Sequence, residues 1–407
     1  MAGQLRVGMV GYAFMGAAHS QAWRTVNHFF DLPLAARMSV VCGRSPDGVA
    51  AAAAKLGWES HTTDWRALVE RDDIDLIDIC TPGDTHAEIA LAALAAGKHV
   101  LCEKPLANTV AEAREMAAAA AEAQAHGVRA MCGFNYRRVP AVELMRRMVA
   151  DGRVGVLRHV RAQYLQDWIV DPSFPLVWRL RKEVAGSGAL GDIGAHIVDM
   201  TQFVSGQSIA SVSALMETFV RTRPLPSASS GLAASAALPE TGEAGTGEAG
   251  TGEAGTGEVT VDDAAIFLAR LSGGAVATYE ATRFATGRKN GLRVELNGSL
   301  GSLVFDFERM NELSFYDATL PEAERGFTRI LVTEPVHPYM AAWWPAGHPI
   351  GYEHTFTHEM RDLIEAIGAG TGPRPSFSDA LQVQLVLDAV AQSAVSAQWT
   401  KVEQVIE

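Results

Sequence analysis

The fold is decided by the stretch Gly8-Met9-Val10-Gly11-Tyr12-Ala13-Phe14-Met15-Gly16, which follows an apolar run over residues 5–10 and opens a helical pattern over 16–26. Gly11, Ala13 and Gly16 take the three glycine positions of the G-x-G-x-x-G pattern. Glycine at the first position permits a tight turn, and small residues at the other two let a pyrophosphate and the helix approach. Helix packing alone would also need such residues, but the place in the first strand–turn–helix unit favours a dinucleotide site. The residues predicted to bind the cofactor here are Gly11, Tyr12, Ala13, Phe14 and Met15.

Outward from this stretch, short apolar runs alternate with helical patterns. The expected strands are 5–10, 38–42, 75–80, 99–102 and 130–134, and the expected helices are 16–26, 46–56, 85–96 and 108–126. Such alternation specifies a parallel sheet with helices on both faces. We therefore predict an α/β protein whose residues 1–130 form a doubly wound Rossmann domain that binds NAD(P).

The pattern changes after Val160 to longer alternating strands joined by short turns. The expected strands are 161–168, 211–221, 262–271, 275–283, 292–298 and 301–307, with helices over 190–204, 352–367 and 378–397. Turns such as Ser272-Gly273-Gly274 favour antiparallel pairing. Residues 131–407 are predicted to form a substrate-binding α+β domain with a large, open, mainly antiparallel sheet. The sequence leaves open which domain the last helix packs on.

Residues 224–258 fit neither domain. This segment repeats TGEAG from Thr241, Thr246 and Thr251, holds five glutamates and no basic residue, and has almost no large apolar side chains. Burial of such a segment would not offset the entropy lost on ordering it. We predict a low-complexity surface insertion between two strands, dispensable for folding and activity.

Composition excludes several classes of function. The 407 residues carry 34 basic and 47 acidic side chains, a net charge of -13 that disfavours nucleic acid and anionic lipid as partners. The four cysteines form no CxxC pair, so a zinc knuckle or a disulfide framework is not expected. His354 and His358 lack the H-E-x-x-H order and are expected at a solvated helix start, with no metal. No leader or membrane span is visible, so a cytoplasmic protein is expected.

The end of the second strand bears on the choice of cofactor. An acidic residue there binds the ribose hydroxyls of NAD, whereas this chain has Cys42-Gly43-Arg44-Ser45. Arg44 can pair with a 2′-phosphate and Ser45 can donate to it. This favours NADP, with NAD possible; an arginine in a surface loop is the plainer alternative.

Two further strands end in polar turns, Thr81-Pro82 and Glu103-Lys104-Pro105. Both turns lie at the carboxyl ends of parallel strands, where such sheets bind ligands, so Thr81, Pro82, Glu103 and Lys104 are predicted to face the cofactor. A lysine there could exchange a proton with a substrate hydroxyl. Taken alone, Glu-Lys-Pro is more often a surface turn.

The stretch Gly186-Ser187-Gly188-Ala189-Leu190-Gly191-Asp192-Ile193-Gly194-Ala195-His196 opens a predicted helix. Asp192 and His196 are four residues apart, which places them on one helix face. A carboxylate that positions a histidine near a hydroxyl is an arrangement suited to general-base catalysis. Such a pair is otherwise often only a surface contact.

These residues together resemble the glucose–fructose oxidoreductase, myo-inositol dehydrogenase and rhizopine-catabolism (GFO/IDH/MocA) family, over nearly the whole chain except the TGEAG insertion. The most specific similarity is Glu103-Lys104-Pro105 combined with the stretch 188–196. The resemblance implies a catalytic triad of Lys104, Asp192 and His196, and places Asn135 at the cofactor. His86 is also predicted to bind the cofactor. This chain departs from NAD-using relatives at Gly43-Arg44.

The run Tyr164-Leu165-Gln166-Asp167-Trp168, with Trp178-Arg179, looks like the sugar-dehydrogenase branch of that family. Strand alternation puts Tyr164, Gln166 and Trp168 on one face, suited to a polyhydroxylated ring, although core packing explains the aromatics equally well. The predicted substrate-binding residues are Tyr136, Gln166, Trp168 and Arg179.

We therefore expect an NAD(P)-dependent oxidoreductase acting on a secondary hydroxyl or ketone of a sugar or cyclitol, working as a homo-oligomer (a dimer or a tetramer). A biosynthetic ketoreductase and a non-catalytic NAD(P) or sugar sensor on the same fold are the alternatives.

Overall fold

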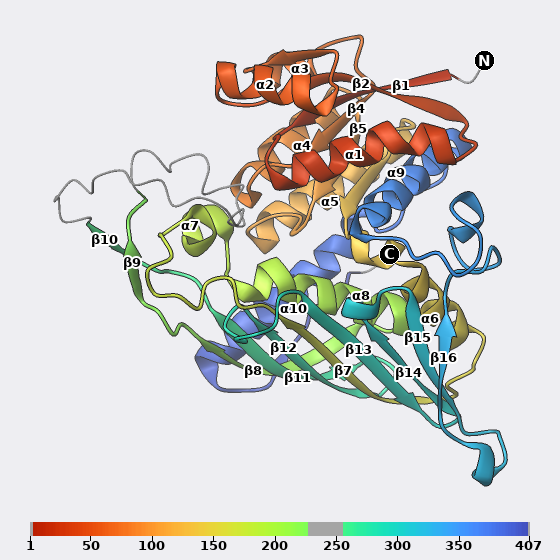
Figure 1. The fold of residues 1–407 in the computed structure, drawn as a ribbon. Coiled ribbons are helices and arrows are strands. Elements are labelled where there is room, and N and C mark those ends of the chain that lie inside the picture. The colour runs from red at the N-terminus through yellow and green to blue at the C-terminus, as the bar shows by residue number, and fades with distance from the viewer. Residues whose placement is uncertain (1–2, 227–254, 406–407) are drawn as a thin grey trace, which may run out of the picture.

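The computed structural model describes residues 3–226 and 255–405. Figure 1 shows an N-terminal sheet with its helices in the upper part and a larger sheet in the lower part. Helices α8 (Ala195–Ser205) and α10 (Phe377–Ser396) lie between them. Within the described residues no helix is long and apolar enough to cross a bilayer.

The N-terminal sheet has six parallel strands in the order β3-β2-β1-β4-β5-β6. Its strands are β1 (Gly3–Val10), β2 (Leu34–Cys42), β3 (Ser60–Thr62), β4 (Leu76–Ile79), β5 (His99–Glu103) and β6 (Ala130–Gly133). Its helices are α1 (Phe14–Phe29), α2 (Pro46–Leu56), α3 (Trp65–Val69), α4 (His86–Ala95) and α5 (Val110–Ala125). The predicted doubly wound sheet is confirmed, and the strand order reverses between β1 and β4, where such sheets bind ligands. The short β3 and α3 were not predicted.

The C-terminal sheet has nine strands among the described residues, in the order β16-β15-β14-β13-β7-β12-β11-β8-β17. They are β7 (Leu157–Leu165), β8 (Ile209–Glu217), β11 (Ala264–Leu271), β12 (Val276–Thr282), β13 (Gly291–Gly298), β14 (Gly301–Asp306), β15 (Glu312–Asp317), β16 (Phe327–Leu331) and β17 (Thr400–Lys401). Only β7 and β12 pair in parallel, so the prediction of a mainly antiparallel sheet is confirmed. Helices α6 (Pro140–Ala150), α8 and α10 cover one face of this sheet.

Short helical turns complete the described chain. The 3-10 turns are η1 (Gly83–Thr85), η2 (Asn135–Arg138), η3 (Trp178–Leu180), η6 (Phe307–Arg309), η7 (Glu322–Glu324) and η8 (Met340–Ala342), and the short helix is α7 (Lys182–Ala185). A π-helical turn, η4 (Leu190–Gly194), leads into α8. The helix predicted over 190–204 therefore begins with a wider turn than the 3.6-residue spacing assumes.

Two predicted boundaries differ from the structure. Strand β7 ends at Leu165, so Gln166 and Trp168 lie in the following loop and strand alternation does not apply to them. The ends of the predicted insertion form a small antiparallel pair, β9 (Thr222–Pro224) with β10 (Thr256–Glu258). The TGEAG repeats fall in 227–254, outside the described residues.

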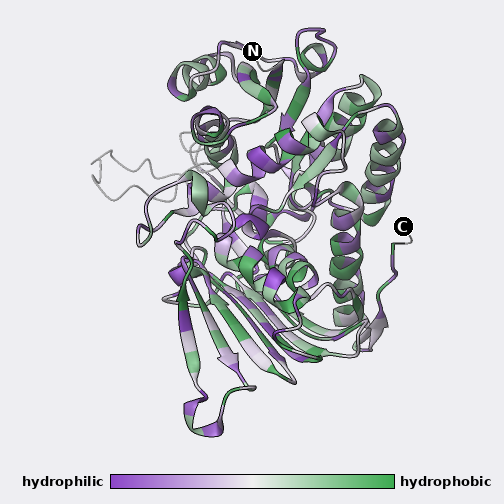
Figure 2. Ribbon diagram, turned by 90° about the vertical axis from the view of Figure 1, so that its right-hand side faces the viewer, coloured by the Kyte–Doolittle hydropathy of each residue, from purple (hydrophilic) through white to green (hydrophobic). Residues whose placement is uncertain are grey.

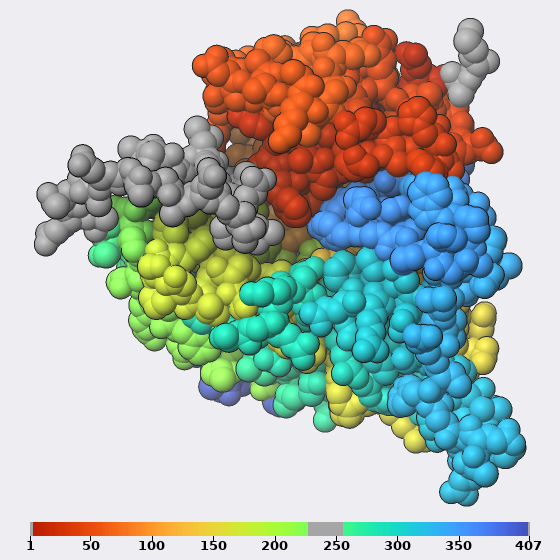
Figure 3. Space-filling model, in the orientation of Figure 1, coloured from red at the N-terminus to blue at the C-terminus, as the bar shows by residue number. Residues whose placement is uncertain are grey.

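The last two long helices connect the two halves of the molecule. Helix α9 (Tyr352–Ala369) packs against α1, and Figure 3 shows this blue segment directly beneath the red one. Helix α10 contacts α5 and β6 on one side and β8 on the other, which answers the question that the sequence left open. The start of α9 is partly solvated, with Glu353 exposed and His354 half-buried, but the expectation is wrong for His358. His358 and Glu359 are fully buried, because this part of the helix lies between the two halves. Both ring nitrogens of His358 are used, by the Arg138 carbonyl and the Trp343 indole.

Candidate active site

The turn from β1 into α1 has the geometry that a dinucleotide needs. Gly11 has a φ of +101°, and a Cβ there would lie 2.7 Å from the Cys80 carbonyl oxygen. A Cβ on Gly16 would lie 2.3 Å from the Gly11 carbonyl oxygen, so the helix starts as close to the strand as glycine allows. Ala13 at the N-cap gives α1 no side-chain hydrogen bond. The first N–H groups of α1 are therefore available for a diphosphate, and these residues fit an NAD(P) cofactor.

At the end of β2, the Tyr12 ring lies over Gly43, where a Cβ would be 2.0 Å from a ring carbon. The Ser45 hydroxyl caps α2 by accepting from the Gly48 N–H at 3.2 Å. Arg44 is exposed and makes no hydrogen bond or ion pair with the described residues. Its guanidinium is therefore free to meet a phosphate beyond the strand.

The turns after β4 and β5 are tied together by His86. Its ring nitrogens lie 2.9 Å from the Thr81 carbonyl oxygen and 3.0 Å from the Pro105 carbonyl oxygen. His86 thus holds together the turn after β4, which contains Pro82, and the turn after β5, which contains Lys104. Sequence reasoning placed His86 at the cofactor; in the structure its ring contacts backbone.

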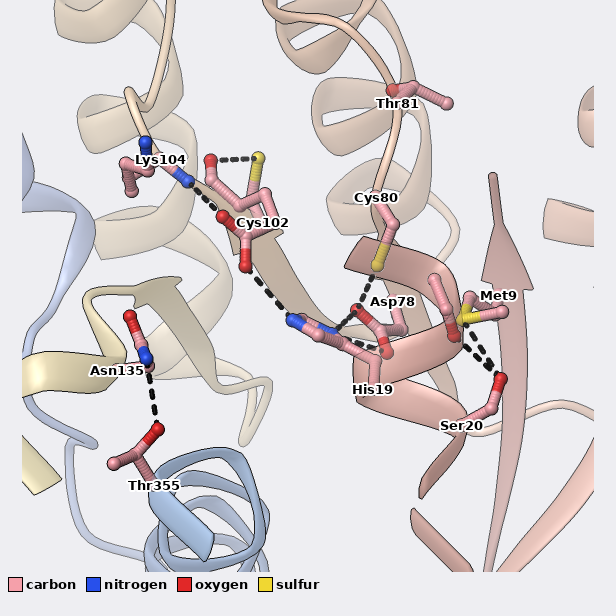
Figure 4. A network of polar contacts seen from close by, with 12 residues as sticks. Met9, His19, Ser20, Asp78, Cys80, Thr81, Cys102, Lys104, Asn135 and Thr355 are labelled. Carbon is pink, nitrogen blue, oxygen red and sulfur yellow. Dashed lines mark hydrogen bonds and ion pairs between the residues drawn. The ribbon is translucent and has the colours of Figure 1, made fainter. Parts of the chain in front are cut away.

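A buried network under these strand ends, shown in Figure 4, was missed from the sequence. His19 of α1 has no exposed surface, and its ring nitrogens lie 3.0 Å from Asp78 and 2.9 Å from Glu103. Burial by itself would lower the pKa of His19, but the Asp78 carboxylate outweighs burial and holds that pKa well above its usual range. Glu103 also accepts the Lys104 N–H at 3.1 Å, so its carboxylate is occupied within the protein. The only sequence signal for this network was His19 itself, three residues after Gly16 in the first predicted helix.

Lys104 meets Asp192 across the junction of the two halves. Its Nζ donates to the Asp192 carbonyl at 2.6 Å and lies 3.3 Å from Oδ1. Arg283, at the end of β12, donates to Asp192 Oδ2 at 2.9 Å and was not singled out from the sequence. Burial raises the pKa of Asp192, but Lys104, Arg283 and Arg179 outweigh it and hold that pKa far below its ordinary value. Asp192 is therefore a carboxylate shared by two cations.

His196 sits in an aromatic environment rather than on Asp192. Its ring centroid is 4.6 Å from that of Tyr136 and 6.0 Å from that of Tyr164. Its Nδ1 is buried without a partner, and no hydrogen bond joins it to Asp192 in the described chain. The direct Asp192–His196 contact expected from their spacing is thus not formed, because η4 widens the turn and the two cations hold the carboxylate. Burial, with Lys104 nearby, lowers the pKa of His196 well below its usual value, so the ring is neutral.

Of the predicted substrate-side residues, Tyr136 contacts this histidine directly, and Gln166 is linked to Tyr136 through Asn290. Gln166 accepts the Trp168 indole N–H at 3.0 Å, and the Arg283 guanidinium lies 5.3 Å over the Trp168 ring. The Arg179 guanidinium stacks on Trp178 and makes no hydrogen bond or ion pair within the part of the chain that the structure describes, while the Arg179 carbonyl accepts from Arg283 at 3.5 Å. Asn290, also missed from the sequence, joins Gln166 to the tyrosines.

Asn135 lies on the other side of this group. Its Nδ2 donates to the Thr355 hydroxyl of α9 at 2.9 Å, as Figure 4 shows. The structure therefore brings Lys104, Asp192, His196 and the substrate-side residues together at the junction, and leaves Arg44 and Ser45 at the far end of the cofactor site.

The comparisons with known proteins agree with this geometry. Residues 5–133 match the oxidoreductase family with an NAD-binding Rossmann fold, and residues 142–304 match the GFO/IDH/MocA C-terminal domain. Levoglucosan dehydrogenase of Pseudarthrobacter phenanthrenivorans is 40% identical over 403 residues, which are 98% of this chain and 99% of that protein. The chain belongs to the GFO/IDH/MocA family of oxidoreductases.

Solved structures of two oxidoreductases superpose on nearly the whole chain. An oxidoreductase domain protein from Kribbella flavida is 61% identical with a TM-score of 0.91, covering 99% of this chain and 100% of that one. Levoglucosan dehydrogenase in complex with NADH and levoglucosan is 39% identical with a TM-score of 0.89 and the same coverage. The expected family, the fold and a nicotinamide cofactor are confirmed. The choice between NAD and NADP stays a prediction.

Proposed function

We propose that this chain is an NAD(P)-dependent dehydrogenase that oxidises a secondary hydroxyl of a sugar or cyclitol, with Lys104, Asp192 and His196 as its catalytic residues. The observation that carries the proposal is the meeting of Lys104 with Asp192 beside a neutral His196, at the carboxyl end of the Rossmann sheet. Relatives named levoglucosan dehydrogenase and inositol 2-dehydrogenase act on polyhydroxylated rings, which fits this site.

The proton chemistry follows from the protonation states. The neutral His196 ring takes the proton of the substrate hydroxyl, and the Lys104 ammonium donates a hydrogen bond to the oxygen as negative charge develops on it. Asp192 holds Lys104 through the 3.3 Å contact, while Arg283 fixes the opposite carboxylate oxygen. The bound NAD(P)+ supplies the acceptor for the hydride that leaves the same carbon, so the alcohol becomes a ketone.

The substrate wall fits hydroxylated rings. Trp168 and Tyr136 offer aromatic faces for C–H groups, and the unpaired Arg179 guanidinium offers donors to ring oxygens. We assign cofactor binding to residues 1–130 and substrate binding to residues 131–407, with α9 returning to pack against α1.

The test is a panel of sugars, anhydrosugars and cyclitols incubated with NAD+ or NADP+, followed by the absorbance of the reduced nicotinamide. Reduction with at least one neutral polyol is expected, and reverse assays with the product ketone would measure the ketoreductase direction. Saturable NAD(P)H binding without reduction by any compound would favour the sensor and contradict the proposal.

We also propose that the chain forms a homo-oligomer through the face of the large sheet that α8 and α10 leave open. Apolar side chains there are largely exposed, with Leu215 at 64%, Ile266 at 50%, Leu268 at 51% and Val276 at 41%. Figure 2 shows hydrophobic and hydrophilic residues mixed along the strands of the large sheet. Light scattering should give a dimer or tetramer mass, and Leu268→Glu should lower it; a monomeric wild type would contradict this proposal.

A cytoplasmic location is proposed because the four cysteines are all free and buried, as in a reducing compartment. Cell fractionation tests it, and recovery outside the cytoplasm would overturn it.

A further inference from the structure

Asn290, in the turn before β13, is the centre of a hydrogen-bond network behind the substrate wall. Its Oδ1 lies 2.7 Å from the Tyr164 hydroxyl and 2.9 Å from Gln166 Nε2. Its Nδ2 lies 3.4 Å from the Tyr136 hydroxyl oxygen. The two tyrosine hydroxyls are 2.7 Å apart. The network thus connects η2, β7, the loop after β7 and the turn before β13.

The direction of these hydrogen bonds is fixed from one end. The Trp168 indole N–H can only donate, so the Gln166 oxygen must face it at 3.0 Å. Gln166 Nε2 therefore points at Asn290 and requires an oxygen there, which sets the orientation of the Asn290 amide. A donor-only group at one end thereby determines each later bond.

The hydrogen bonds of the two tyrosines have fixed directions as well. Asn290 Oδ1 cannot donate, so the Tyr164 hydroxyl must use its single proton to donate a hydrogen bond to this oxygen. The short contact between the tyrosines must then use the Tyr136 proton, with Tyr164 accepting. Asn290 Nδ2 donates to the Tyr136 oxygen, which completes the set. The Tyr136 proton is thus directed away from the site, and its oxygen is left as a hydrogen-bond acceptor.

The Tyr136 and His196 ring centroids are 4.6 Å apart, so a substrate whose hydroxyl faces His196 would have its neighbouring carbons close to Tyr136. A free hydroxyl on the neighbouring carbon of the substrate can donate to it, whereas a methoxy group, a carbonyl or a bare CH2 cannot. Resting on the proposed function, we propose that Asn290 is a specificity-determining positioning residue, which orients Tyr136 to select substrates with a free hydroxyl beside the carbon that is oxidised.

Asn290→Asp tests this with little change in shape. The ionised carboxylate cannot donate to Tyr136 and instead attracts its proton. At pH 8 we expect KM for the best polyol to rise by about tenfold or more, and its preference over the neighbouring-deoxy analogue to shrink. As pH falls and the introduced carboxylate is protonated, its O–H again donates to Tyr136, so both parameters should return toward wild type. Asn290→Leu should show the same loss at every pH.

The matched control is Asn297→Asp, near the end of the β13 strand that follows Asn290, where Asn297 pairs with Arg161 at the open face of the sheet. It should keep wild-type KM and selectivity. Unchanged selectivity in Asn290→Asp, or a loss that does not recover at low pH, would overturn the proposal.

A second measurement separates this proposal from the proposed function. The seven tyrosines, labelled with 13C at Cζ, can be followed by NMR without any substrate, with Tyr136→Phe and Tyr164→Phe giving the two assignments. Both resonances should shift in Asn290→Asp and return on acidification. If they shift while no sugar reduces either cofactor in the wild type, the network stands and the proposed function fails. If they do not shift, the directional network is wrong.

Discussion

At the scale of single residues, the site pairs one carboxylate with two cations and keeps the neighbouring histidine neutral. Lys104 and Arg283 both pair with Asp192, whereas His196 stays neutral against the Tyr136 ring. Burial favours this arrangement, because it lowers the pKa of His196 and because the buried Asp192 carboxylate stays ionised only through its two cations. A neutral base beside a fixed ammonium is the arrangement that proton removal from an alcohol requires.

We predict that Lys104→Ala and His196→Ala each lower kcat by roughly a hundredfold or more, while the Kd for NAD(P)H, from fluorescence titration, stays nearly unchanged. In the proposed mechanism both side chains act on the substrate oxygen, whereas the cofactor phosphates are predicted to bind at the start of α1. The double variant should be little worse than either single one, because they act on one proton. Near-normal turnover in His196→Ala would place the base elsewhere, with Tyr136 or Tyr352 next.

At the scale of elements, the turn from β2 into α2 is predicted to determine the choice between NAD and NADP. Arg44→Ala is expected to raise the Kd for NADP by about tenfold while changing that for NAD little, because only NADP has a phosphate for the guanidinium. Lys55→Ala, in the last turn of α2, is the control. Equal weakening of both cofactors would show that Arg44 does not meet the phosphate.

The same turn changes how the reverse experiment should be designed. Sequence alone suggests Gly43→Asp to create NAD preference, but a Cβ at Gly43 would lie 2.0 Å from the Tyr12 ring. That variant must displace Tyr12, which is itself predicted to contact the cofactor. Its effect would therefore mix charge with packing, and Arg44 is the cleaner site.

At the scale of the whole molecule, Glu359 marks the contact between α9 and the Rossmann half. Its carboxylate is fully buried and makes no hydrogen bond with the described residues, and it faces His19, Arg138, Glu103 and Asp78. Burial raises the pKa of Glu359 to about 8, although His19 and Arg138 act in the opposite direction. The native state therefore holds a proton there that the unfolded chain releases.

The raised pKa of Glu359 makes the native state less stable as pH rises. Between the ordinary carboxyl pKa and about 8, the native state binds more protons at this site, so the free energy of unfolding falls as pH rises, by up to about 1.4 kcal/mol per pH unit. Glu359→Gln should flatten that decline in denaturant titrations from pH 5 to 8.5. Glu115→Gln, on the exposed side of α5, should not. An unchanged slope in Glu359→Gln would mean that the carboxyl is already ionised.

Local patterns determined much of this protein. The glycines around Gly11, the alternation of strand and helix, and the turns at Thr81 and Glu103 specified a Rossmann half with polar residues at its binding edge, because those signals depend on neighbouring residues. The change of period after Val160 predicted the second sheet, but not β15 or the short edge strands β16 and β17. The few residues of β16 and β17 carry little pattern.

Contacts between distant residues were decided only by the tertiary structure. The spacing of Asp192 and His196 predicted a pair, yet the π-turn and the charge of Arg283, 91 residues away, gave Asp192 different partners. His19 became part of the site through Glu103, and Asn290 through Gln166, neither of which any spacing rule could foretell. Sequence periodicity reports which face of an element is buried; which charges meet there depends on how the elements pack, because electrostatic and hydrogen-bond partners are chosen by distance in space.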